Sequence, residues 1–305
     1  MTMLPGEIKQ FPVEDEYKKN TSITPDDIRE LRQWLKTQPH LPEKYITDLD
    51  LILAYHACGR SSGVTKQVVD LHYTLRTLFT NFFKDRRVES VEQICKAVLI
   101  CPLPTRTKDG NAILYTHMVN YDTKVFIYSD TVKAALMVID LWQYEEGTWP
   151  GMLMVLDFEG MSLGHLAKID LQTLQQILYY LQETMLVRLK GLHFLNAPSW
   201  MDKFLLMMKP FTKKELLDIL RIHTTGSDTI KQYIPIEALP KDCGGSYKTI
   251  EECRDEVWKK LSANKTYFIN EESKRVTEAL RPGKPKTITD IFGGIEGSFK
   301  KLEID

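Results

Sequence analysis

The sequence predicts an α/β protein with two parts, an all-helical N-terminal domain followed by a βαβ-type domain on a mainly parallel sheet floor. The first ninety residues show only the 3.6-residue period of amphipathic helices. Beyond them, short apolar runs alternate with longer helical patterns, which is typical of parallel sheets. The length of 305 residues agrees with two domains at ~150 residues each.

Three helices are expected in the N-terminal part. Thr24 is a typical N-cap and Pro25 suits the first helical position, so an amphipathic helix should begin there. A second helix is expected from Pro42 towards Cys58, ending at Gly59. The third carries a long apolar stripe made of Val68, Val69, Leu71, Leu75, Leu78, Phe79, Phe82 and Phe83.

The period changes after the Asp109-Gly110 turn. Strands are expected in the β-branched and aromatic run and in two short apolar runs, at 112–119, 151–158 and 189–195. Helices are expected between and after them, at 129–142, 170–185, after Pro198 and at 213–220. From Arg281 onward, prolines and glycines predict a surface tail with little regular structure.

Composition excludes several classes of protein. Hydrophobic residues form 43% and charged residues 27% of the chain, which is ordinary for a globular fold and not for a disordered or fibrous one. The 40 basic and 41 acidic residues nearly cancel, which disfavours nucleic acid as a partner. Five cysteines without a CxxC pair, no signal-like start and no apolar run near ~20 residues predict a cytoplasmic protein.

The segment 160–164 matches G-x-S-x-G after a buried strand, which is the pattern of a nucleophile elbow. Ser162 would be the nucleophile of a serine esterase. One of Asp202, Asp218 and Asp228, together with His223, would complete the triad. No glycine-rich oxyanion segment precedes it, and few strands remain for a hydrolase sheet. We therefore treat the esterase as a minor alternative and expect that the protein is not an enzyme.

Other chemical patterns favour structural interpretations. Asp157 opens a D-x-x-G, but no phosphate-binding G-x-x-x-x-G-K-[ST] accompanies it, so a strand-end turn is expected. His56, Cys58, Cys95 and Cys101 lack the paired spacing of a zinc site, so neither metal nor cofactor is expected. The stripe Trp200, Phe204 and Met208 fits plain core and a lid over an apolar ligand equally well.

Several segments together resemble the CRAL-TRIO proteins, which include retinaldehyde-binding, tocopherol-transfer and Sec-type lipid-exchange proteins. They occur in that family's order and cover most of the chain: 156–160 with Ser162 and His165, 191–198, 209–211, and Leu239-Pro240 followed by Gly244-Gly245. Four further segments are similar to the arthropod branch: 102–104, Asp109-Gly110, Tyr121-Asp122 and 297–302.

The resemblance implies a carrier that binds one hydrophobic small molecule and exchanges it at membranes through a mobile gate helix at about 198–222. The implied domains are 1–95 (helical), 96–255 (lipid-binding) and 256–305 (helix and tail). The ligand would be a retinoid, a carotenoid, a tocopherol-like or another isoprenoid lipid. By position, its pocket would be lined by Thr131, Ala134, Ala135, Val138, Leu156, Met161, Leu163, Ile177, Leu178, Leu181, Met185, Leu189, Leu192, Phe194, Trp200, Phe204, Leu205, Met208 and Phe211.

The family's membrane-contacting cations correspond here to Arg188, Lys190 and Arg221. Phosphoinositides would be their partners, although a solvated strand edge explains Arg188 and Lys190 equally well. Serines of the tocopherol-binding branch are replaced by Ala134 and Val138, which argues against α-tocopherol itself. The remaining alternative is a phospholipid-sensing adaptor, whose protein partner the sequence does not identify.

Overall fold

The computed structural model describes residues 5–299, with side chains described up to residue 293. Its centre is a five-stranded sheet in the order β1-β2-β3-β4-β5. The first pair is antiparallel and the other three pairs are parallel, as the alternation of strand and helix predicts. The strands are β1 Val98–Pro102, β2 Ala112–Met118, β3 Met152–Asp157, β4 Leu189–Ala197 and β5 Leu220–Thr224.

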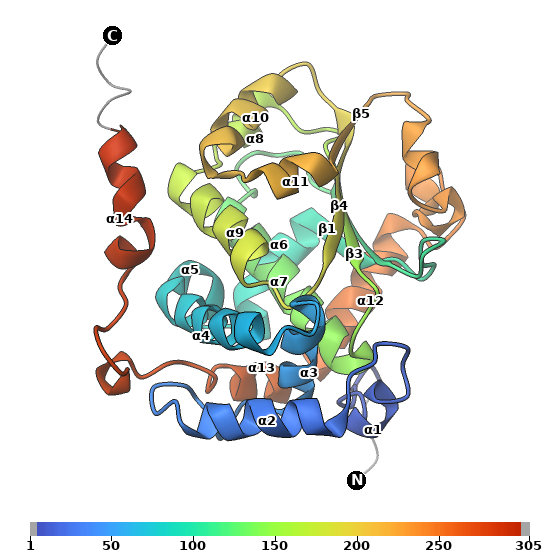
Figure 1. Ribbon diagram of the computed structural model, residues 1–305. Coiled ribbons are helices and arrows are strands. Elements are labelled where there is room, and N and C mark those ends of the chain that lie inside the picture. Colours follow the sequence, from blue (N-terminus) through green and yellow to red (C-terminus); the bar gives the residue numbers. More distant parts are fainter. Residues whose placement is uncertain (1–4, 300–305) are drawn as a thin grey trace.

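Helices cover one face of this sheet (Figure 1). They are α7 Tyr128–Glu146, α8 Leu163–Leu166, α9 Leu171–Glu183, α10 Met201–Met208 and α11 Lys214–Ile219. Alternate strand residues such as Leu114, Leu192 and Phe194 point to this side and join the main apolar core. The predicted helix at 129–142 is one turn longer than expected, because the chain turns only at Gly147, which has a φ of 73°.

Short 3₁₀ turns cover the opposite face: η3 Thr229–Gln232, η4 Ile236–Ala238 and η5 Lys241–Cys243. Ile234 and Leu239 from this segment pack in one cluster with Leu153, Val155 and Leu195 of the sheet. Both faces of the central strands are thus buried, which explains why their sequences read as continuous apolar runs.

The N-terminal part is helical, as predicted, and consists of α1 Val13–Glu16, α2 Pro25–Lys36, α3 Asp48–Ala57, α4 Ser62–Leu78, α5 Thr80–Phe83, η1 Val88–Val91 and α6 Glu92–Ala97. Thr24 caps α2 in a reciprocal pair with Asp27. The expected start of the second helix at Pro42 is wrong, because Thr47 and Asp50 form the capping box that begins α3. The third predicted helix is divided at Phe79, whose ψ of 69° is not helical.

A buried ionic network joins the N-terminal helices to the sheet domain. Asp140 on α7 accepts hydrogen bonds from Arg76 Nη2 and Arg86 Nη1, both at 2.6 Å. Glu271, on α13 (Lys265–Glu271), accepts bonds from the same arginines at 3.0 and 2.9 Å. Arg86 is fully buried and lies over the ring of Phe83. Charges buried so completely fix the relative positions of the elements that carry them.

The C-terminal region differs from expectation in two ways. Helix α12, Ile250–Ala263, runs across the domain boundary expected at residue 255. The tail from Arg281, predicted to have little regular structure, follows η6 Glu278–Leu280 and contains α14 Ile288–Phe299, so that expectation is wrong. Phe292 stacks on Phe79 at 5.9 Å and meets Tyr179 at 5.3 Å, which anchors α14 against α9. Residues 300–302 of the expected closing motif lie outside the described residues.

Among the residues described, none of the helices combines the length and the apolar composition that crossing a lipid bilayer requires.

Candidate ligand pocket and gate

Helix α10 closes over the sheet with an aromatic contact. Phe204 lies 5.8 Å from the ring of Phe158 and 5.7 Å from that of Phe194 on β4. Trp200, just before the helix, reaches Phe158 at 6.1 Å. Phe204 is only 5% exposed, whereas Leu206 on the outer side of the same helix is 67% exposed. The helix therefore turns one apolar side toward the sheet and the other toward solvent.

Most of the predicted pocket residues lie in the main apolar core, which also extends to the N-terminal helices and to α13. The following belong to this core: Ala134, Ala135, Val138, Leu156, Met161, Ile177, Leu178, Leu181, Met185, Leu189, Leu192, Phe194, Trp200, Phe204, Leu205, Met208 and Phe211. Two do not join it. Leu163 is half exposed on α8, and Thr131 donates its hydroxyl hydrogen to the Ile127 carbonyl within its own helix.

A cleft of about 420 Å³ opens where α9, α11 and β4 meet the N-terminal helices. Most of its walls are apolar: Ala57, Cys58, Val64, Val68, Leu181, Met185, Val187, Leu189, Leu216 and Ile219. Its polar groups are Gln182, Glu183, Thr184, Lys213 and Glu215. Three of the predicted pocket residues line it, namely Leu181, Met185 and Leu189.

Sequence reasoning did not find the side of this cleft formed by α3 and α4. Ala57, Cys58, Val64 and Val68 precede the first strand, which begins at Val98, and only the docking of the helices places them there. The sequence predicts that Cys58 is a structural cysteine and not a zinc ligand, but it does not place Cys58 at a pocket. Burial raises the pKa of its thiol, which suits an apolar wall better than a reactive or metal-binding site.

The three predicted membrane-contacting cations do not lie together. Lys190 and Arg221 line one open cleft of about 1000 Å³, on the face of the sheet opposite the helices. Arg106, Lys108 and Lys231 line the same cleft. Arg188 instead donates from Nε to the carbonyl of His56 on α3 at 2.8 Å. Burial, and then the charge of Arg188, lowers the pKa of His56 to about 4.

Two histidines lie beside the cation-lined cleft. His193 Nδ1 and His223 Nε2 are 3.0 Å apart, and the rings stack at 5.3 Å. His223 also bonds the Thr229 hydroxyl at 2.7 Å, which fixes β5 to η3. Burial, and then the neighbouring His223 and Arg221, lower the pKa of His193 to about 4, and burial also lowers the pKa of His223. The pair is therefore neutral at pH 7, and the contacts of His223 with His193 and Thr229 occupy both of its ring nitrogens.

The G-x-S-x-G segment forms the strand-end turn expected from the resemblance. Gly160 has a φ of 72°, and a Cβ there would come within 2.1 Å of Tyr121. Ser162 caps α8 in a reciprocal pair with His165, whose Nδ1 lies 3.0 Å from the serine Oγ. In the described chain His165 Nε2 is buried without a hydrogen-bond partner, so no carboxylate orients this histidine. The geometry is that of a helix cap.

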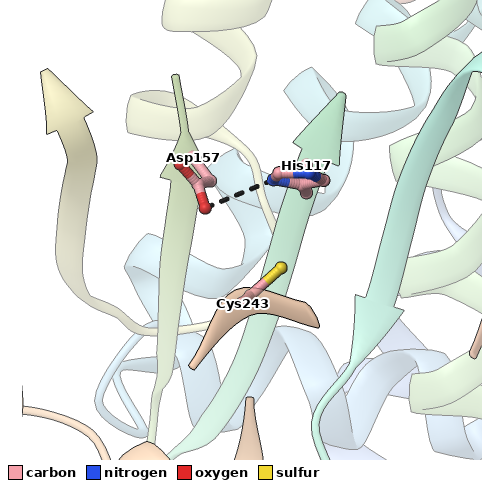
Figure 2. A group of neighbouring side chains, drawn as sticks. All are labelled: His117, Asp157 and Cys243. Carbon is pink, nitrogen blue, oxygen red and sulfur yellow. Dashed lines mark hydrogen bonds and ion pairs between the residues drawn. The ribbon is translucent and has the colours of Figure 1, made fainter. Parts of the chain in front are cut away.

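His117, Asp157 and Cys243 present a nitrogen, an oxygen and a sulfur atom within 4.8 Å of one another (Figure 2). Asp157 is fully engaged by the fold. Its Oδ2 accepts from the Tyr115 hydroxyl at 2.5 Å and faces His117 Nδ1 at 3.3 Å. Its Oδ1 accepts from Asn196 Nδ2 and from the backbone N–H of residue 159.

The ionisation of this cluster fits a hydrogen-bonded hub. Burial raises the pKa of Asp157, but the bonds from His117 and Tyr115 outweigh burial and hold that pKa below its ordinary value. Burial raises the pKa of the Cys243 thiol to about 12. The cluster joins β2, β3 and β4 to the η5 turn, and the donors of Asp157 leave little for a metal ion.

Two protein families match the chain. The family described as CRAL/TRIO domain matches residues 96–245, and the one described as Pinta-like, UBA domain matches residues 20–93. The first of these ranges contains the whole sheet, helix α10 and the strand residues that line the two clefts. The second contains α2, α3, α4 and α5.

Curated relatives are similar over about three quarters of the chain. Clavesin-1 of Pongo abelii and of Mus musculus is 23% identical over 236 residues, which are 76% of this chain and 66% of the relative. Alpha-tocopherol transfer protein-like of Homo sapiens is 22% identical over 229 residues, 74% of this chain and 61% of the relative. The match thus spans slightly less than two thirds of these relatives' length.

Among solved structures, the chain is similar to the crystal structure of Sfh5, with a TM-score of 0.45 and 11% identity over 92% of this chain and 99% of that one.

Proposed function

The chain belongs to the CRAL-TRIO family through residues 96–245, and on this premise we propose that it binds one hydrophobic small molecule and exchanges it at membranes. The observation that carries the proposal is the cleft of about 420 Å³ beside α11, the second helix of the gate segment, where ten of the fifteen lining residues are apolar. Its volume lies within the range of small-molecule pockets.

An isoprenoid lipid suits this site best. Retinoids, carotenoids and tocopherol-like molecules are long and apolar and need few hydrogen-bonding partners, whereas a phospholipid brings a charged headgroup. The name of one relative refers to α-tocopherol transfer. Ala134 and Val138 do not line this cleft, but they stand where the tocopherol-binding branch has serines, and their lack of hydroxyls favours a less polar head than that of α-tocopherol. An ordinary phospholipid is the second candidate.

Release would occur by movement of the gate, residues 198–222, between a closed state in water and an open state at a membrane. The closed state buries Phe204 and Met208 against the sheet. Lipid tails would replace these contacts at a membrane and remove the cost of exposing them to water. Lys190 and Arg221, at the open cleft, would contact the anionic leaflet, where each cation adds ~1 kcal/mol.

The experiment compares Phe204→Asp with Leu206→Asp. Each variant and the wild type is incubated with vesicles carrying retinol, β-carotene, α-tocopherol or phosphatidylcholine, re-purified, extracted and analysed by mass spectrometry. The wild type should retain one of these lipids stoichiometrically. Phe204→Asp should lose it while remaining folded by circular dichroism, because the charge enters the aromatic contact. Leu206→Asp should retain it.

If the wild-type protein retains none of the four lipids, the proposal of a carrier is wrong and the alternative of a phospholipid-sensing adaptor is favoured. Equal retention by both aspartate variants would remove α10 from the role of gate.

A further inference from the structure

The C-terminal end of α9 is tied to the gate segment by one side-chain amide. Gln182 donates from Nε2 to the Phe211 carbonyl at 2.9 Å, and its Oε1 accepts from the backbone N–H of Lys213 at 2.7 Å. Its second Nε2 hydrogen goes to the Leu178 carbonyl in its own helix at 2.7 Å. The amide's two donors and its oxygen are all engaged, so its orientation is fixed.

These bonds hold the connection between the two helices of the gate segment, α10 and α11, which we call the joint of the gate. Thr212 is extended, with φ −108° and ψ 120°, and it separates η2 (Lys209–Phe211) from α11. The amide bonds the residues on either side of it, as a neighbouring strand would. Lys213 is the N-cap of α11 but provides no side-chain cap, and Gln182 takes up its N–H group. The backbone that must rotate for the gate to swing is thus bonded to α9.

An ion pair lies beside the amide. Lys213 Nζ pairs with Glu183, the residue after Gln182, and this bond raises the pKa of Lys213. The lysine side chain is 60% exposed and the glutamate side chain 23%, and both lie at the apolar cleft. The pair therefore joins the same two elements as the amide, at a place that a surface can reach.

We propose that Gln182 and the Glu183–Lys213 pair form a latch on the gate, and that an anionic lipid surface opens it by replacing Glu183 as the partner of Lys213. The proposal rests on the gate of the proposed function and specifies how that gate is regulated. Gln182 is a positioning residue, because it acts on the joint of the gate.

The chemistry of the latch matches such a release. The amide bonds are neutral and hold the joint without responding to the membrane's charge. Lys213, the more exposed partner of the pair, can be reached by a leaflet, and a leaflet rich in phosphatidylserine offers it many carboxylates and phosphates in place of one glutamate. Loss of the pair leaves only the amide to hold the joint, and lipid contacts with α10 then compete with two neutral hydrogen bonds.

The first test measures amide hydrogen exchange of residues 209–216 in the unliganded protein, so it does not depend on the identity of the ligand. Gln182→Leu should accelerate exchange there about 25-fold, since a net hydrogen bond is worth about a fivefold population change, two are lost, and the two factors multiply. Gln172→Leu, at an exposed position of the same helix, should leave exchange unchanged. Equal exchange in Gln182→Leu and wild type would overturn the latch.

The second test adds vesicles of phosphatidylcholine alone or with phosphatidylserine. In the wild type, phosphatidylserine should raise exchange of the joint above the level seen with phosphatidylcholine. Glu183→Gln should raise exchange without vesicles and respond less to phosphatidylserine, because Lys213 has already lost its partner. An undiminished response in Glu183→Gln would overturn the trigger. Failure of the wild type to retain any lipid would instead overturn the proposed function and leave these exchange results standing.

Discussion

The two sides of helix α9 are held by different forces. On one side, α4, α7 and α13 meet in the network of Arg76, Arg86, Asp140 and Glu271, which is almost entirely buried. On the other side, the gate helix α10 rests on aromatic rings, and its joint is held by the amide of Gln182. Separating a buried charge from its partners leaves it uncompensated in the interior, whereas apolar contacts can be exchanged for lipid. On the proposed function, the first side stays closed and the second opens.

The largest effect should follow from breaking the charged side. Asp140→Ala leaves Arg76 and Arg86 buried with one carboxylate where two stood, so we expect a loss of about 3–5 kcal/mol in the free energy of unfolding. Urea denaturation measures it. Asp255→Ala, which removes an exposed pair with Arg254, should cost at most about 1 kcal/mol. Similar losses in the two variants would show that the network does not distinguish this side.

Low pH should also lower the free energy of unfolding through His72, which lies beside the buried ionic network. Burial and the charge of Arg76 lower the pKa of His72 to about 3, and His72 faces Asp140 and Tyr180 as well. Between pH 6.5 and this value the unfolded chain binds a proton that the folded protein does not. The free energy of unfolding therefore falls as the pH falls, by up to about 1.4 kcal/mol per pH unit from this histidine.

Urea midpoints between pH 7 and pH 5 check this slope. His72→Asn removes the titration and keeps a donor for the Thr184 carbonyl, which His72 Nδ1 contacts at 2.8 Å. The variant should be less sensitive to pH over this window, although His56 and His193, whose pKa values are also lowered to about 4, will keep part of the slope. An unchanged slope in the variant would contradict a neutral, buried His72.

Local signals in the sequence fixed much of the fold correctly. The cap at Thr24 and the continuous apolar run of β3 depend on neighbouring residues, and both were predicted. The antiparallel strand β1 and the edge strand β5 were missed, because a five-residue segment is a strand only by virtue of its pairing. Helix α14 was missed for the same reason, since one distant contact, Phe292 on Phe79, anchors it.

The candidate site divides in the same way. Helical spacing grouped Trp200, Phe204 and Met208 on one side of α10, and the family resemblance supplied the positions on β4. The latch at Gln182 joins residues 29 and 31 positions apart. The buried network joins residues 54 to 195 positions apart. A pattern within one segment contains no information about such partners, and only the docking of the elements determines them.

The smallest expected effect concerns Arg188 and Lys190, two cations that the sequence analysis assigned to the same membrane contact. Arg188 belongs to the side that stays closed, because it bonds α3 through the His56 carbonyl, whereas Lys190, two residues along the strand, is exposed at the open cleft. Lys190→Ala should weaken binding to phosphatidylserine vesicles about fivefold, as the loss of ~1 kcal/mol requires, without changing stability. Arg188→Ala should instead lower the urea midpoint and leave vesicle binding nearly unchanged. Sedimentation with vesicles beside urea denaturation measures both quantities, and equal weakening of vesicle binding by the two variants would show that the side that stays closed also contacts the membrane.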